Sequence, residues 1–196
     1  MKESTSRPCW ICGDPANSDE HKHKRSDLVA RYGRNWTPEQ QPFVIRGDGS
    51  ARWTRIQGPN DRKNLYEKYL CRPCNNARTK PFDQAYQEFS DWILATGTTL
   101  HSKEAIDFAE IYGSAYTEKS LNLLSYFAKS LGCRIVDAGT DPPEALRRIL
   151  TDVNRNVRRC RLFGQPPGKN KLRAGSRLLV SRFPEIKFIA CCCGVL

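Results

Sequence analysis

The spacing of apolar residues changes near Phe82, and the change divides the chain into two kinds of predicted structure. Over residues 7–81, short apolar runs alternate with Gly, Pro and charged residues, which is typical of short strands joined by turns. From Phe82 onward, apolar residues recur three and four positions apart, which predicts helices. Within the first part, residues 43–56 are predicted to form a β-hairpin around Gly47-Asp48-Gly49.

Four helices are predicted in the second part. The first begins at Phe82 and is ended by Gly97, the second covers residues 103–112, and the third covers residues 118–131. The fourth begins at Asp141, a good N-cap that is followed by prolines suited to a first turn. The predicted buried faces consist of Phe82, Ala85, Tyr86, Phe89, Trp92 and Ile93 in the first helix, Leu121, Leu124, Phe127 and Leu131 in the third, and Leu146, Ile149, Leu150, Val153 and Val157 in the fourth.

The rest of the chain is predicted as a Pro/Gly linker at residues 164–168 and two strands at residues 176–183 and 186–192. With 196 residues, the chain has room for one medium domain or two small ones. We divide it into residues 1–97 and a basic, mainly helical C-terminal region, residues 98–196.

Charge and hydropathy narrow the expected partners and location. Lys and Arg number 32 against 21 Asp and Glu, which gives a formal net charge of +11. This excess favours nucleic acid as the partner, with DNA preferred to RNA. No apolar run is long enough to cross a bilayer, and the polar first residues lack the apolar core of a signal peptide. We therefore expect a cytoplasmic protein without a membrane partner.

Four cysteines form two Cys-x-x-Cys pairs, Cys9/Cys12 and Cys71/Cys74. In a reducing compartment such pairs are more often metal ligands than disulfides. Gly13 follows the first pair and would let backbone amides point at the thiolates. Two pairs of soft ligands predict one tetrahedral structural Zn²⁺ ion. The alternatives are a redox-active pair and free buried cysteines.

A second group of residues lies between and just after the cysteine pairs. Glu20 precedes His21, and His23 follows two positions later. Asn75 comes directly after Cys74, the second cysteine of the second pair. In a strand, His21 and His23 would face the same side. Hydrolysis of a phosphodiester needs a base, for which histidine is suited near neutral pH, and a hard divalent cation held by oxygen ligands. The alternative is a solvated strand edge followed by a helix cap.

The order Cys-x-x-Cys, Glu20-His21 and Cys71-Arg-Pro-Cys74-Asn75-Asn-Ala-Arg78 resembles an HNH endonuclease of the zinc-stabilised kind. The resemblance covers about residues 7–90. It implies a ββα-metal finger, in which a hairpin carries the catalytic histidine and a helix carries the last motif residue. The expected fold class is therefore α+β, with this zinc-bound module followed by a mainly helical C-terminal region.

The resemblance also implies roles for individual residues. His21 would be the general base, and Glu20 would ligate a catalytic Mg²⁺ or Mn²⁺ ion. Asn75 would take the last motif position, and Asn64 is the candidate for the middle asparagine. His23 and Asp83 are further possible ligands of the divalent cation.

Basic residues supply the expected contacts with nucleic-acid phosphates, since arginine's planar fork suits phosphate oxygens. The alternative is an ordinary solvated helix face. The candidates are Arg78, Lys80, Arg147, Arg148, Arg155, Arg158 and Arg159.

The leading hypothesis is a divalent-metal-dependent HNH-type endonuclease with a structural zinc held by four cysteines. A non-catalytic zinc-finger adaptor that binds nucleic acid through the same surface is the alternative. A third possibility is an interaction protein whose basic helical region binds an acidic protein partner.

Overall fold

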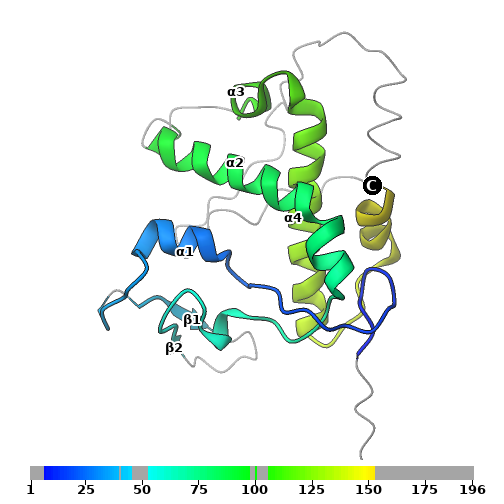
Figure 1. Cartoon of the computed structure of the whole chain (residues 1–196), viewed down its shortest axis with the longest axis horizontal. Helices are drawn as coiled ribbons and strands as arrows, with labels where there is room; N and C mark the ends of the chain where they lie inside the picture. The colour runs from blue at the N-terminus through cyan, green and yellow to red at the C-terminus, as the bar shows by residue number, and fades with distance from the viewer. Residues whose placement is uncertain (1–6, 40, 46–52, 98–99, 101–105, 153–196) are drawn as a thin grey trace, which may run out of the picture. The chain divides into compact units, whose positions relative to one another are not determined.

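A computed structural model of the chain describes residues 7–39, 41–45, 53–97, 100 and 106–152 (Figure 1). The chain divides into two compact units. The first, here called unit 1, consists of Met1–Lys80 and Ala128–Thr151; the second, unit 2, consists of Pro81–Phe127 and Asp152–Leu196.

Unit 2 is helical and is built around an apolar core. Its elements are α2 (Lys80–Thr96), α3 (Phe108–Tyr112) and the first part of α4 (Tyr116–Asp137). The predicted helix that begins at Phe82 and is ended by Gly97 is confirmed, and Gly97 has a φ of 46° that favours glycine. The fully buried members of the core are Ala85, Phe89, Tyr112 and Leu123.

Unit 1 contains a short helix, a hairpin and several ordered loops. Helix α1 covers Arg25–Tyr32, and β1 (Phe43–Ile45) pairs antiparallel with β2 (Trp53–Arg55). This pairing confirms the predicted hairpin. A 3₁₀ turn at Arg62–Asn64 and a π-helical segment at Pro73–Arg78 follow. The part of α4 from Ala128 onward also belongs to this unit.

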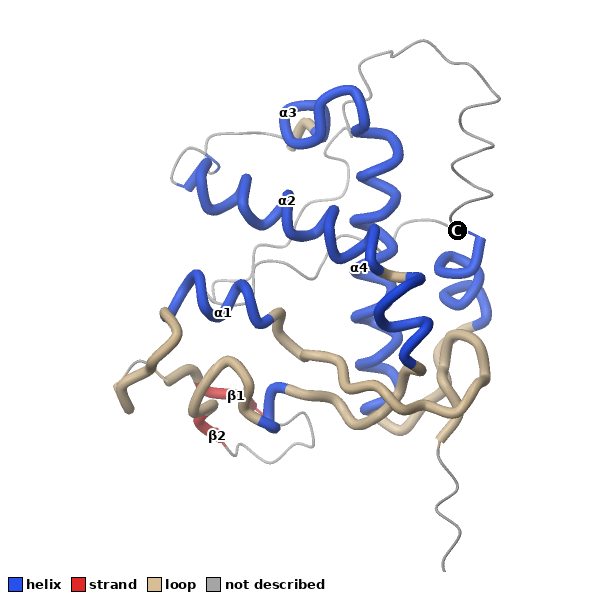
Figure 2. Tube along the Cα trace, in the orientation of Figure 1, coloured by secondary structure: helices blue, strands red, loops and turns tan. Residues whose placement is uncertain are grey.

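The expected fold class, an α+β chain with a ββα-metal module, is wrong. Among the described residues, sheet is limited to two strands of three residues each, and helix dominates (Figure 2). The segment that carries His21 makes only isolated bridges, Ser18 to Leu70 and His21 to Leu65. The backbone leaves the extended conformation after His21, so the hairpin that the finger requires does not form around the histidines.

Helix α1 was not predicted, because residues 7–81 were expected to hold only strands and turns. Its buried residue is Leu28, and Gly33 ends it with a φ of 78° and a backbone N–H bonded to the Val29 carbonyl. The turn into α1 also explains why His23 does not continue a strand beside His21. The expectation that both histidines face one side of a strand is therefore wrong.

Helix α4 is longer than predicted, and its buried face differs from the predicted one. The helix continues past Leu131 to Asp137. Leu124 and Leu131 are exposed, although they were expected to be buried. The inward positions carry Leu123 and several smaller or polar side chains instead, namely Asn122, Ser125, Ala128, Lys129 and Cys133.

The predicted fourth helix is present over residues 144–152, where the described part of the chain ends. Leu150 on this helix is buried, whereas Ile149 is exposed. Val153, Val157, the linker at 164–168 and the strands at 176–183 and 186–192 lie outside the described residues. None of the helices that the structure describes is long and apolar enough to span a membrane.

Candidate metal centre and histidine site

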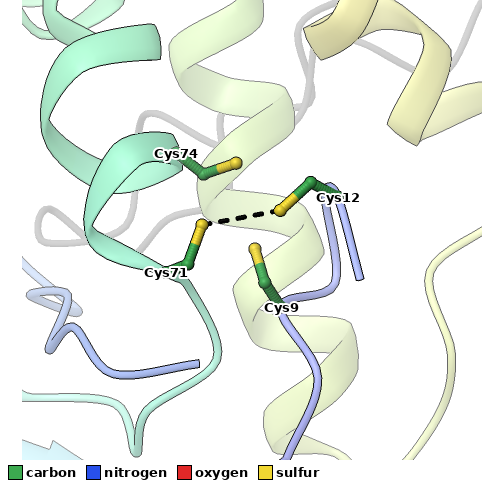
Figure 3. Close-up of side chains that lie close together, drawn as sticks. All are labelled: Cys9, Cys12, Cys71 and Cys74. Atoms are coloured by element: carbon green, nitrogen blue, oxygen red, sulfur yellow. Dashed lines mark hydrogen bonds between the residues drawn. The ribbon is translucent and has the colours of Figure 1, made fainter. Parts of the chain in front are cut away.

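The four cysteines of the two Cys-x-x-Cys pairs converge on one point in unit 1 (Figure 3). Their sulfur atoms all lie within 4.8 Å of one another, and the sulfurs of Cys12 and Cys71 are 3.5 Å apart. Four thiolates around a zinc ion, with Zn–S bonds of about 2.3 Å, place their sulfurs about 3.8 Å apart. The cluster can therefore hold one metal ion, and its donor set fits a structural zinc.

Local backbone geometry explains how each pair presents its sulfurs. The Gly13 N–H donates to the Cys9 carbonyl at 2.8 Å, and Gly13 has a φ of 87°, which other residues rarely adopt. The second pair begins the π-helical segment, where the Asn75 N–H donates to the Cys71 carbonyl at 2.9 Å. π-Helical turns are rare and often occur at functional sites.

Electrostatics favour a thiolate at Cys9. Burial raises the pKa of this thiol, but backbone N–H groups of Cys71, Cys12 and Ile11 outweigh that effect, so the net shift is downward. The Arg78 guanidinium donates to the Cys74 sulfur at 3.3 Å, but burial and the neighbouring cysteine sulfurs outweigh its charge and raise the pKa of Cys74. Burial raises the pKa of Cys12 to about 11 and that of the lone Cys133 thiol to about 12.

Trp10 attaches the first cysteine turn to helix α4. The indole is buried against Gly132, and a methyl group added at Gly132 would overlap the ring. Glycine in a helix interior costs about 0.5–1 kcal/mol relative to alanine. The close approach of the ring gives the reason for glycine at this position.

The segment that carries His21 is held by hydrogen bonds on both sides of the histidine. The Tyr66 N–H donates to the Glu20 carbonyl at 2.9 Å, and the Lys22 N–H donates to the Asn64 carbonyl at 2.7 Å. The completely buried Asn64 side chain accepts from the His23 N–H at 3.0 Å and donates to the His23 carbonyl at 2.9 Å. Asn64, the predicted middle asparagine, therefore fixes the backbone just after His21.

Asn75 fixes the backbone just before His21. Its Nδ2 donates to the Ser18 hydroxyl at 3.0 Å and to the Asp19 carbonyl at 2.9 Å. The buried Thr79 hydroxyl donates to the Asn75 main-chain carbonyl at 2.7 Å. The Asn75 Oδ1 atom is buried and has no hydrogen-bond partner among the described residues. A buried amide oxygen without a partner is of the type that ligates Mg²⁺ or Ca²⁺.

His21 is half-buried, and its surroundings favour the neutral ring. Burial lowers the pKa of His21, and the charge of Arg25 acts in the same direction, whereas the carboxylates of Glu20 and Asp19 oppose it. The net shift is downward, so the imidazole is uncharged at neutral pH. A neutral imidazole can accept a proton from water, as a general base must.

Glu20, expected to ligate a divalent cation, contacts a residue that the sequence did not point to. Its Oε1 lies 3.2 Å from the Nζ atom of Lys129, whose side chain is only 1% exposed. Lys129 is one of the contact residues here that the sequence did not indicate, and Ser18, Tyr66 and Thr79 are others. Lysine is almost never fully buried unless paired, but no local pattern distinguishes a buried lysine from an exposed one on an amphipathic helix.

The structure places the two other candidate cation ligands differently. The His23 side chain is exposed, and Asn64 binds the His23 backbone. Asp83 lies in the first turn of α2 and belongs to unit 2, whereas His21, Glu20 and Asn75 belong to unit 1. In unit 1, Asn64 and Asn75 thus bind the segment that carries Glu20 and His21.

The candidate phosphate-binding residues fall into several environments. Arg78 and Lys80 are exposed, although Arg78 also contacts the cysteine cluster. Arg148 forms an exposed ion pair with Glu144 at 3.4 Å, and the Nε atom of Arg147 is buried without a partner among the described residues. The remaining candidates, Arg155, Arg158 and Arg159, lie outside the described residues.

No family model, curated protein sequence or solved structure matches the chain. Function must therefore be inferred from the residues of the site and their geometry.

Proposed function

We propose that this protein is a divalent-metal-dependent endonuclease with HNH-type chemistry that hydrolyses nucleic-acid phosphodiester bonds. His21 is the general base, and the four-cysteine cluster holds a structural zinc. The proposal concerns the chemistry of the site and does not require the architecture of a ββα-metal finger.

One observation carries the proposal. Three residues far apart in the sequence, His21, Asn64 and Asn75, meet at one short segment, residues 18–23. They are three of the residues to which the HNH resemblance gives a role, together with Glu20. A solvated strand edge would not need two buried asparagines to fix the backbone on either side of a histidine.

Each residue of the proposed site has a separate role. The neutral His21 ring accepts a proton from the water that attacks phosphorus. Asn64 and Asn75 hold the main chain on either side of His21 in place. The orphaned Asn75 Oδ1 fits a hard cation and would be one of its ligands. Such a cation, when bound, stabilises the charge that develops on the phosphate. The zinc takes no part in the chemistry, because four thiolates leave no open coordination position.

The proposal includes the expected partners and location. Exposed Arg78 and Lys80 are offered as contacts to phosphate near the site, with DNA preferred to RNA and a protein partner for the C-terminal region left as a further possibility. All five described cysteines, including the four of the cluster, are free thiols. Free thiols with metal-ligand geometry suit the reducing cytoplasm, where we place the protein.

The test is nicking of supercoiled plasmid, with RNA in parallel, in Mg²⁺ or Mn²⁺. Wild type should cleave, and His21→Ala should lose cleavage by about 100-fold or more because the general base is removed. His101→Ala removes the same type of side chain outside the described residues and is the matched control. Zinc content should be equal in all three proteins. Binding without cleavage by wild type would reject the proposal and favour the adaptor.

A further inference from the structure

One face of α4 contacts the segment around His21 and the first cysteine turn. Lys129, Gly132 and Cys133 are spaced three and four residues apart, so they lie on one side of the helix. Gly132 receives the Trp10 indole. Asp137, one turn further, accepts from Lys22 at 3.2 Å and from the Tyr69 hydroxyl at 2.9 Å. The helix thus contacts residues on both sides of His21.

Lys129 is the most deeply buried charged group in this contact. Its side chain is 1% exposed, that of Glu20 is 20% exposed, and the two charged atoms are 3.2 Å apart. A buried ammonium group is unfavourable unless a partner compensates its charge. Glu20 supplies that charge, and Glu20 is bonded directly to His21 along the chain.

The ion pair between Glu20 and Lys129 adds a side-chain anchor to the backbone hydrogen bonds that hold the segment around His21. The main chain of Ser18 to His23 is fixed by hydrogen bonds with Leu70, Asn75, Tyr66 and Asn64. These bonds set the path of the backbone and leave only the side-chain torsions of Glu20 to be fixed. The ion pair with Lys129 fixes the Glu20 side chain on the α4 side.

We propose that Lys129 is a positioning residue for His21 and acts through its buried ion pair with Glu20. The inference rests on the proposed function of His21 as general base. In this assignment Glu20 anchors the histidine segment to α4, and the oxygen ligands of the cation come from elsewhere, with Asn75 among them. Lys129 itself touches neither the nucleic acid nor the reacting atoms.

The experiment compares cleavage kinetics of Lys129→Met and wild type, with rates expressed per zinc-loaded, folded molecule. The value of kcat should fall by about 10- to 100-fold, because a small misplacement of a catalytic group costs that much. The KM for the nucleic acid and the Mg²⁺ concentration for half-maximal rate should stay within about twofold, since Lys129 contacts neither.

Lys119→Met is the matched control. Lys119 also lies on α4 and forms an ion pair, at 2.6 Å, with Glu88, but this pair is in unit 2. Its removal should leave kcat per folded molecule unchanged. An equal loss in both variants would overturn the inference.

A double variant, Glu20→Gln/Lys129→Met, keeps the inference testable if the single variant does not fold. It removes both charges together, so no unpaired charge is left in the interior. A folded, zinc-loaded double variant should still have a low kcat, because His21 is no longer anchored through the pair. Recovery of the wild-type kcat together with folding would show a purely structural pair and overturn the inference.

The experiments distinguish rejection of the positioning role of Lys129 from rejection of the proposed nuclease function. Wild type that does not cleave would reject both, and this result precedes any measurement on Lys129. Wild type that cleaves, with Lys129→Met equally active or altered only in KM, would reject the positioning role alone.

Discussion

The two units of this chain are stabilised by different kinds of contact. Unit 2 buries Phe89, Ala85, Tyr112 and Leu123 in an ordinary apolar core, and Tyr86 stacks on Tyr126 with ring centroids 3.9 Å apart. Unit 2 also buries two polar residues of α4, Asn122 and Ser125. The interior of unit 1 differs in that it includes a four-cysteine cluster and a larger set of buried polar residues bound to specific partners. These polar residues are Asn64, Asn75, Thr79 and Lys129.

This difference matters because apolar burial is non-directional, whereas each polar group needs its own partner. The stability of unit 2 should be spread over many contacts. The stability of unit 1 should depend on a metal ion and a few hydrogen bonds. The candidate site therefore lies in unit 1, which a single chemical change such as metal removal should unfold most readily.

The largest expected effect is metal removal. Chelation of zinc, or Cys71→Ser, should unfold unit 1, because binding of a structural zinc contributes on the order of 10 kcal/mol to folding. Hydrogen exchange followed by mass spectrometry should show loss of protection over residues 9–79 and retained protection over residues 82–96. Cys133→Ala, a buried cysteine outside the cluster, should keep its zinc. Equal loss of protection in both units would break the comparison.

The reverse experiment is Phe89→Ala in unit 2. Phe89 is 6% exposed, and removal of a buried phenylalanine costs about 3–5 kcal/mol. Protection should be lost over residues 82–96 while the protein still binds one zinc, as measured by metal analysis. Leu94→Ala, at a side chain that is 58% exposed, should have little effect. Release of zinc by Phe89→Ala would contradict the separation of the two kinds of stability.

A smaller effect is expected from Asn64→Ala in unit 1. This change leaves the partly buried N–H and carbonyl of His23 without the Asn64 side chain, at a cost of about 1 kcal/mol in the free energy of unfolding. Denaturant titration measures the loss, and cleavage should fall as well if His21 is the base. Asn76→Ala, at the exposed neighbour of Asn75, is the control for asparagine removal.

The smallest effect tests the contact between Trp10 and α4. The higher helix propensity of alanine should stabilise the folded state of Gly132→Ala by about 1 kcal/mol. The added methyl group would overlap the Trp10 indole, however, and this overlap should destabilise the folded state by about 1–3 kcal/mol. The net result should be a modest loss of stability, seen as a lower melting temperature and a shift in Trp fluorescence. Leu131→Ala, at a neighbouring exposed residue, should cause no fluorescence shift. A stabilised Gly132→Ala variant would show that the ring can move away.

The same contrast explains how much could be predicted from sequence. The apolar stripe of α2 and its glycine stop depend on local spacing, and the cysteine pairs are short local motifs, so both were predicted. Asn64 and Asn75 came from a resemblance and remain predictions as catalytic residues. Their buried hydrogen bonds to residues 18–23 depend on segments far apart in sequence, which local patterns do not show.

The errors have the same origin. Leu124 and Leu131 were assigned to the buried face of α4 because they are apolar, yet the helix turns Lys129 and Cys133 inward. The contact between the Glu20 carboxylate and Lys129 on this distant helix was likewise not predicted, because it joins segments far apart in the sequence. The ββα-metal module was expected because short local motifs resemble those of an HNH finger, whereas α1 and ordered loops occupy this part of the chain.

The division of α4 between the two units has a consequence for synthesis. Unit 1 is discontinuous along the chain, since residues 81–127 come between its two parts. The ribosome completes both cysteine pairs before it reaches Lys129 or Gly132. Lys22 and Asp137, which join the two parts, are 115 residues apart. At about 5–20 residues per second, the nascent first part waits several seconds or more for its helix. Zinc binding during that interval would keep the first part folded and protect it from proteolysis. In metal-starved cells, more of the nascent chains should therefore be degraded.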